Sequence, residues 1–212
     1  MKVTKVFHSC VLVECKGTKI LLDPGSWVFG EGYMKKIDAD AVFVTHEHQD
    51  HYFPDALKEF GGKIITNASL AGKMHDAGIK ADVIQKGKSL QIQDFSIRAI
   101  NCPHGALPVP CPENAGFIIK ENNSEKRIFA PGDSLEFDEE VQGIDVLLAP
   151  VIAPWMRVTE GIDYVKRVKP KITVPVHDGF MKYPFATNMF CSVLADSGFN
   201  IQARNPGESF EI

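Results

Sequence analysis

Short segments that mix hydrophobic and polar positions open the chain, and their alternation is typical of half-buried β-strands. The segments are KVTKVF (2–7), CVLVEC (10–15) and KILLD (19–23). The turn KGT (16–18) joins the last two segments, and because glycine accepts positive φ angles, it predicts a β-hairpin. The glycine-rich segment 24–36 then predicts a loop without regular structure.

The rest of the chain alternates between apolar strand patterns and amphipathic helix patterns. Strands are predicted at 41–45, 63–66, 88–101 (a hairpin turning at Gln93 and Asp94), 115–121 and 127–130 (a second hairpin), 145–150, 171–176 and the C-terminus. Helices are predicted at 53–62, 68–78, 159–168 and 184–198. Thr159 is the predicted cap of the third helix, and Gly78 and Gly198 are expected to end the second and fourth.

The order of these elements predicts the fold class. Hairpins come first, then strands and helices in alternation, and this scheme occurs twice along the 212 residues. Two mixed sheets packed together with helices outside satisfy that order, because each sheet must bury one apolar face. We therefore expect an α/β fold, of the kind also classed as α+β, in a single domain spanning 1–212.

Composition limits the classes of partner. A net charge of -4 argues against a broad nucleic-acid surface, which needs clustered Lys and Arg. No apolar run approaches the roughly 18 residues needed to span a membrane. The five cysteines include no CxxC pair and are typical of free thiols in a reducing compartment, so a cytoplasmic protein is expected. A homo-oligomer is compatible with a compact enzyme, but no interface signature predicts one.

Three of the chain's seven histidines lie in the segment VTHEHQDHY (44–52). His46 and His48 follow the predicted strand 41–45 two residues apart, so their side chains can point to one side. Asp50 and His51 come next and can reach a second point nearby. Imidazoles and carboxylates suit Zn, Mn or Fe, and this segment therefore predicts part of a metal site.

Three further candidate ligands each follow a predicted strand: His104, Asp133 and His177. The carboxyl ends of strands converge at one edge of a layered sheet, where such folds build their sites. Taken alone, each residue has another interpretation, as a hydrogen-bonded structural histidine or as the turn aspartate beside Gly132. Together with the first segment, they indicate one metal centre.

The ordered pattern HxHxDH, a later His, a Gly-Asp and a final His resembles that of the metallo-β-lactamase fold hydrolases. The resemblance covers nearly the whole chain, and it implies a four-layer αβ/βα sandwich with two divalent metal ions, zinc first, with manganese or iron as alternatives. It also implies that Asp23, in ILLDPG, orients a ligand histidine. The implied ligands are His46, His48 and His104 for one ion, Asp50, His51 and His177 for the other, and Asp133 bridging them.

The opening VFHSCVLVECKGTKILLDPG resembles a narrower branch, the short single-domain members related to ascorbate-lactone hydrolases and the N-acyl phosphatidylethanolamine phospholipase D group. His8 lies in the turn between the first two predicted strands, as a candidate proton donor or substrate contact, with a packing role as the alternative. Phe7 stands where that branch commonly has glycine, and HDGF stands where it often has His-x-Gly-Thr. These departures weaken any transfer of substrate.

The implied activity is hydrolysis of an ester-type bond in a small molecule. A hydroxide held by two cations would attack a carbonyl or phosphorus, with Asp50 and Asp133 positioning it. The chain has no GxSxG motif, in agreement with a reaction without a side-chain nucleophile. Phosphodiesters, lactones and thioesters stay open as substrates, with an iron-dependent redox enzyme and a non-catalytic metal-binding scaffold as alternatives.

Several aromatic and apolar residues have two interpretations, as the lining of a substrate mouth or as core. They are Trp27, Phe29, Tyr33, Trp155 and Met156.

Overall fold

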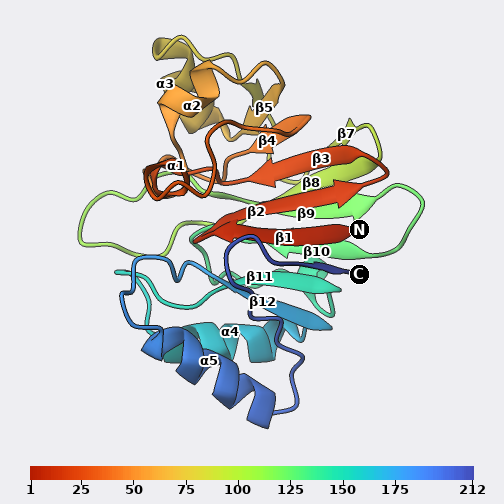
Figure 1. Ribbon diagram of the computed structural model, residues 1–212, viewed down its shortest axis with the longest axis vertical. Coiled ribbons are helices and arrows are strands. Elements are labelled where there is room, and N and C mark those ends of the chain that lie inside the picture. The colour runs from red at the N-terminus through yellow and green to blue at the C-terminus, as the bar shows by residue number, and fades with distance from the viewer.

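The computed structural model describes residues 1–212, and it consists of two mixed β-sheets that face each other with helices on both outer faces (Figure 1). The predicted four-layer sandwich is confirmed. No helix is both long enough and apolar enough to cross a membrane.

The first sheet has seven strands and carries the N-terminal hairpins. In spatial order, these are β13 (Ser209–Glu211), β1 (Lys2–Phe7), β2 (Cys10–Cys15), β3 (Thr18–Leu22), β4 (Ala41–Phe43), β5 (Lys63–Thr66) and β6 (Asp82–Val83). Strands β1, β2 and β3 pair antiparallel, as the hairpin pattern predicts, and β3 to β6 pair parallel. The parallel strands β3 and β4 therefore end at the same edge of the sheet.

The second sheet has six strands. Their order is β12 (Ile172–Val176), β11 (Val146–Pro150), β10 (Arg127–Ala130), β9 (Ala115–Glu121), β8 (Phe95–Asn101) and β7 (Ser89–Ile92). Strands β10, β11 and β12 are parallel, and β9 pairs antiparallel with both β8 and β10. Strands β8, β10, β11 and β12 therefore all run the same way, and their carboxyl ends share one edge.

The main core lies between the sheets, where Phe43 of β4 meets Phe117 of β9 edge-on at a centroid distance of 5.3 Å. The outer faces are covered by helices. Helices α1 (Ser26–Gly30), α2 (Pro54–Lys58) and α3 (Ala68–Asp76) cover the first sheet, and α4 (Val158–Val168) and α5 (Phe185–Asp196) cover the second. A 3₁₀ turn, η1 (Glu139–Val141), precedes β11.

Two local predictions are wrong. The segment 24–36 contains helix α1, because Val28 is buried against the first sheet and this packing outweighs the surrounding glycines. Helix α4 begins at Val158, so Thr159 lies inside it. The Glu160 carboxylate accepts a hydrogen bond from the backbone N–H of Arg157 at 2.6 Å. This bond caps the first turn of the helix in place of a threonine.

Replacing Phe43 with alanine tests the inter-sheet core. Phe43 is fully buried, so Phe43→Ala should lower the free energy of unfolding by about 3–5 kcal/mol. Phe185→Ala is the matched control, because Phe185 is 74% exposed; it should change stability by less than about 0.5 kcal/mol. Chemical denaturation measures both, and equal losses would contradict the packing described.

Candidate metal centre

The carboxyl ends of strands from both sheets bring the predicted site residues to one edge of the sandwich. The ligand loop, residues 44–53, follows β4 and carries four of them. Each of the others lies within three residues of a strand end: His8 follows β1, Asp23 β3, His104 β8, Asp133 β10 and His177 β12. Side chains separated by up to 169 residues of sequence thus meet in space.

These side chains form two clusters, in each of which the potential ligand atoms lie within 4.8 Å of one another. The first group comprises His46, His48, His104 and Asp133. The second group comprises His8, Asp50, His51 and His177. The two groups differ from the predicted ligand sets only in where they place His8 and Asp133.

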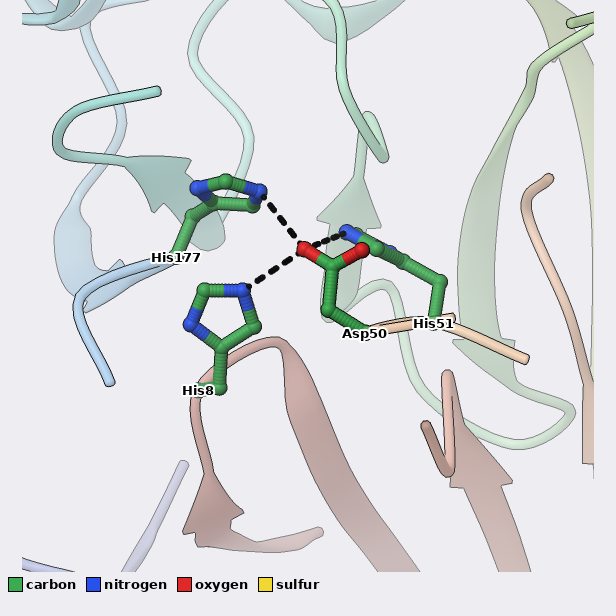
Figure 2. A group of neighbouring side chains, drawn as sticks. All are labelled: His8, Asp50, His51 and His177. Carbon is green, nitrogen blue, oxygen red and sulfur yellow. Dashed lines mark hydrogen bonds and ion pairs between the residues drawn. The ribbon is translucent and has the colours of Figure 1, made fainter. Parts of the chain in front are cut away.

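Figure 2 shows the second group, with one carboxylate oxygen of Asp50 at its centre. Asp50 Oδ2 lies 3.1 Å from His8 Nε2, 3.3 Å from His177 Nε2 and 3.6 Å from His51 Nε2. Three imidazoles from separate parts of the chain therefore converge on a single oxygen.

Asp133 lies between the two groups and turns one oxygen to each. Its Oδ1 is 3.1 Å from His51 Nε2 and 3.3 Å from His177 Nε2. Its Oδ2 is 3.6 Å from His104 Nε2 and 3.9 Å from His46 Nε2. This is the position that a bridging carboxylate requires.

Hydrogen bonds on the outer side of the rings determine which nitrogen carries the hydrogen in the second group. His177 Nδ1 lies 2.8 Å from the Ile152 carbonyl oxygen, which can only accept, so Nδ1 must donate. His51 Nδ1 likewise donates to the Asp23 carboxylate at 2.9 Å. In both rings the hydrogen on Nδ1 leaves Nε2 as the atom that faces the centre, where a cation can take the place of a proton.

The first group follows the same rule. His104 Nδ1 donates to the Gly105 carbonyl oxygen at 2.6 Å. The Thr45 hydroxyl gives its hydrogen to Asp23 at 2.9 Å, so it accepts from His46 Nδ1 at 3.0 Å. His48 is turned the other way, with Nδ1 3.1 Å from His46 Nε2, and would bind a cation through Nδ1.

His8 differs from the ligand histidines. The Gly179 N–H donates to its Nδ1 at 3.0 Å, which leaves the ring hydrogen on Nε2, facing Asp50. Burial lowers the pKa of His8 to about 4, so the ring is neutral near pH 7. Its inward nitrogen thus presents an N–H, and it donates to Asp50 instead of offering a lone pair.

Three buried polar atoms at the centre have no hydrogen-bond partner: His51 Nε2, His177 Nε2 and Asp133 Oδ1. Unpaired buried polar atoms are rare and costly, and here two imidazole nitrogens and a carboxylate oxygen converge. A divalent cation would satisfy all three, and imidazole nitrogen with carboxylate oxygen is the donor set of zinc, manganese and iron. The residues present therefore fit metal ions in both groups.

The electrostatic field of the two carboxylates is strong enough to reverse the effect of burial. Burial lowers the pKa of His177, but Asp133 and Asp50 outweigh it and raise the pKa to about 9. Burial raises the pKa of Asp133, but His177 and His51 outweigh it and hold the pKa well below its ordinary value. The centre thus keeps its carboxylates ionised and attracts positive charge.

A cavity of about 280 Å³ opens directly above both groups. Its floor is formed by His48, Asp50, Asp133 and His177, and its walls by Trp27, Leu107, Pro154, Trp155 and Phe180. The two tryptophans therefore line the mouth. The sequence offered no signal that Leu107 or Pro154 would line the cavity. For Phe180, the only signal was its position near His177.

The other residues with two interpretations lie outside the cavity lining. Phe29 packs against Phe53 at 5.3 Å, Tyr33 stacks on Phe7 at 4.3 Å, and Met156 is buried in the interior.

A family model described as a beta-lactamase superfamily domain matches residues 2–177. The chain therefore belongs to the beta-lactamase superfamily and is a metal-dependent hydrolase with the metallo-β-lactamase fold. It is 33% identical over 190 residues to a UPF0173 protein of Pyrococcus furiosus, with 84% of each chain covered. A UPF0173 metal-dependent hydrolase of Nanoarchaeum equitans is 27% identical over 191 residues, covering 84% of this chain and 83% of that protein.

Among solved structures, the fold is similar to that of Igni18, a metallo hydrolase from the archaeon Ignicoccus hospitalis. The TM-score is 0.79 at 23% sequence identity, over 100% of this chain and 98% of that one. This likeness supports the fold along the full chain.

Removing the Asp23 carboxylate tests whether it orients the ligands. Asp23→Ala deletes the acceptor of His51 Nδ1–H, so zinc affinity should fall by about 10–100-fold. Titration calorimetry on metal-free protein measures this loss, with circular dichroism to verify folding. Asp38→Ala is the control, since Asp38 is 78% exposed and pairs only with Lys19. Equal zinc affinities in the two variants would contradict the orienting role.

Proposed function

We propose that the protein hydrolyses an ester-type bond in a small molecule, with one divalent cation in each group and zinc as the first candidate. Asp133 supports this proposal most directly, because it turns one oxygen to each cluster of inward-facing imidazoles. His46, His48 and His104 would hold one cation, and Asp50, His51 and His177 the other. Manganese and iron suit the same donors.

Two cations at such a site lower the pKa of water toward ~7 and stabilise the negative charge that develops during hydrolysis. The protein's own groups then orient the reaction. Asp50 and Asp133 both border the cavity and can accept hydrogen bonds from the attacking water. The water oxygen forms a bond to the reacting carbon, the carbon–oxygen or carbon–sulfur bond breaks, and the leaving group takes the proton. The products are a carboxylic acid and an alcohol or thiol.

Trp155 has a part in holding this arrangement. Its indole N–H donates to Asp133 Oδ2 at 2.9 Å, a charge-assisted hydrogen bond that restrains the carboxylate between the groups. A fixed carboxylate lowers the cost of reorganisation when charge develops.

His8 is a positioning residue in this proposal. It is 1% exposed and does not line the cavity, so its Nε2–H reaches Asp50 and not a substrate. This donor holds the Asp50 carboxylate in place beside the second cation. A positioning role therefore takes the place of the predicted substrate contact or proton donor.

Replacing one proposed histidine ligand and the proposed bridging carboxylate tests the hydrolase proposal. His48→Ala and Asp133→Ala should lower metal content and reduce hydrolysis of nitrophenyl esters by at least about a hundredfold, the upper end of what orienting residues cost. His75→Ala and Asp76→Ala are matched controls, with side chains 90% and 87% exposed. Elemental analysis and hydrolysis assays with added zinc or manganese measure both properties.

Full metal content and undiminished hydrolysis in both ligand variants would refute the assignment. Iron alone after native purification would favour the redox alternative, and no turnover of any ester with any metal would favour the scaffold.

His8 accepts a hydrogen bond from Gly179 and donates one to Asp50, and this donor role yields a separate prediction. His8→Gln can still donate to Asp50, whereas His8→Met keeps the volume but cannot. His8→Met should weaken binding of the second cation by about 10–100-fold, and His8→Gln should lose much less. Zinc titration of metal-free protein measures the affinity of each cation. Equal losses in both variants would contradict the donor role.

A further inference from the structure

The walls above the metal centre are apolar. The five wall residues are four hydrophobic side chains and a proline, and three of them are aromatic: Trp27, Trp155 and Phe180. Trp27 and Phe180 lie 6.3 Å apart and are steeply inclined, at 61°. Aromatic walls of this kind pack well against flat apolar groups, by stacking or by edge contact.

No lysine or arginine lines the cavity. Lys5, which is buried near the Phe180 loop, forms an ion pair with Asp178 at 2.8 Å and donates to the Pro175 carbonyl oxygen at 2.9 Å. That ion pair anchors the loop, and the Lys5 ammonium is therefore not available to bind a ligand. Phosphate oxygens are usually bound by arginine, lysine or free backbone N–H groups, and this cavity wall offers neither basic side chain.

The volume also limits the substrate. At about 280 Å³, the cavity is at the lower end of the range for small-molecule sites, which begins near 300 Å³. A long acyl chain or a lipid headgroup with its chains would extend far outside it. The enclosed part of the substrate must be about the size of a single ring with a short reacting group.

We infer that the substrate is a small, uncharged carboxylic ester, lactone or thioester carrying a flat apolar group, and not a phosphodiester. This inference rests on the proposed hydrolysis and names its substrate class. The apolar group would lie between Trp27, Trp155 and Phe180, with the reacting carbonyl over Asp50 and Asp133. An anionic diester would instead lose hydration against these walls without gaining a basic side chain, which leaves only the cations at the floor to balance its charge.

The chain's two tryptophans both line this cavity, so intrinsic fluorescence reports on its occupancy directly. Acetanilide serves as an uncharged, slowly hydrolysed ester mimic, and phenyl methylphosphonate as an anionic diester mimic of similar size. Acetanilide should bind at least about tenfold more tightly, both in zinc-loaded and in metal-free protein. Equal or tighter binding of the phosphonate to the zinc-loaded protein would overturn the inference.

A charge placed in the wall gives an internal check. Leu107→Lys adds a cation to a half-exposed wall position and should tighten phosphonate binding by about tenfold through direct attraction. Val109→Lys is the control, because Val109 lies in the same loop, is 60% exposed and is outside the lining. Identical phosphonate affinities in the two variants would show that the probes bind elsewhere and would overturn the inference.

Turnover separates this inference from the proposed function. Zinc-loaded protein should hydrolyse para-nitrophenyl acetate and leave bis-para-nitrophenyl phosphate intact. Hydrolysis of the diester alone would overturn the inferred substrate class and uphold the proposed hydrolase function. Tight binding of acetanilide without turnover of any ester would refute the hydrolysis and leave the preference of the cavity for uncharged compounds standing.

Discussion

A single buried carboxylate, Asp23, ties the ligand loop to the sheet and orients one histidine in each metal group. It accepts the backbone N–H of Thr45 at 2.8 Å, the Thr45 hydroxyl at 2.9 Å and His51 Nδ1–H at 2.9 Å. Because the Thr45 hydroxyl is committed to Asp23, its lone pair faces His46 Nδ1. The ring orientations of two candidate ligand histidines, one from each group, therefore depend on one side chain at the end of β3.

The backbone around the centre carries strain that the surrounding contacts must hold. His8, Asp23 and His177 all have positive φ angles, of 53°, 44° and 58°, although none is glycine. Such conformations cost on the order of 1–3 kcal/mol each and cluster at functional sites. They persist here because bonds on both sides fix them: the His177 N–H donates to the His8 carbonyl oxygen at 3.3 Å, and the Asp23 N–H to Phe43 at 2.9 Å.

The sequence predicts that the candidate metal ligands converge, because the relevant information is local. The candidate ligands lie in the loops that follow apolar strands, and strand order brings those ends to one edge, so the residue types and their approximate convergence follow from pattern alone. The role of His8 does not follow, because it depends on the backbone N–H of Gly179, 171 residues away. Helix α1 was missed for a similar reason, since only the burial of Val28 against the first sheet stabilises it among glycines.

Of the cavity walls, the sequence pointed only to Trp27 and Trp155, and it left both open, because an apolar side chain has the same sequence signal whether it lines a cavity or fills a core. Trp155 shows that wall and metal centre are nevertheless one structure. Its indole N–H donates to Asp133, while its ring lies so close to Gly105 that a Cβ at that position would clash with it. Any change at Trp155 would therefore disturb the Asp133 carboxylate together with the cavity wall. Leu107 and Phe180 have no such bond to the ligands, so substrate preference can change at these two positions while the metal centre is preserved.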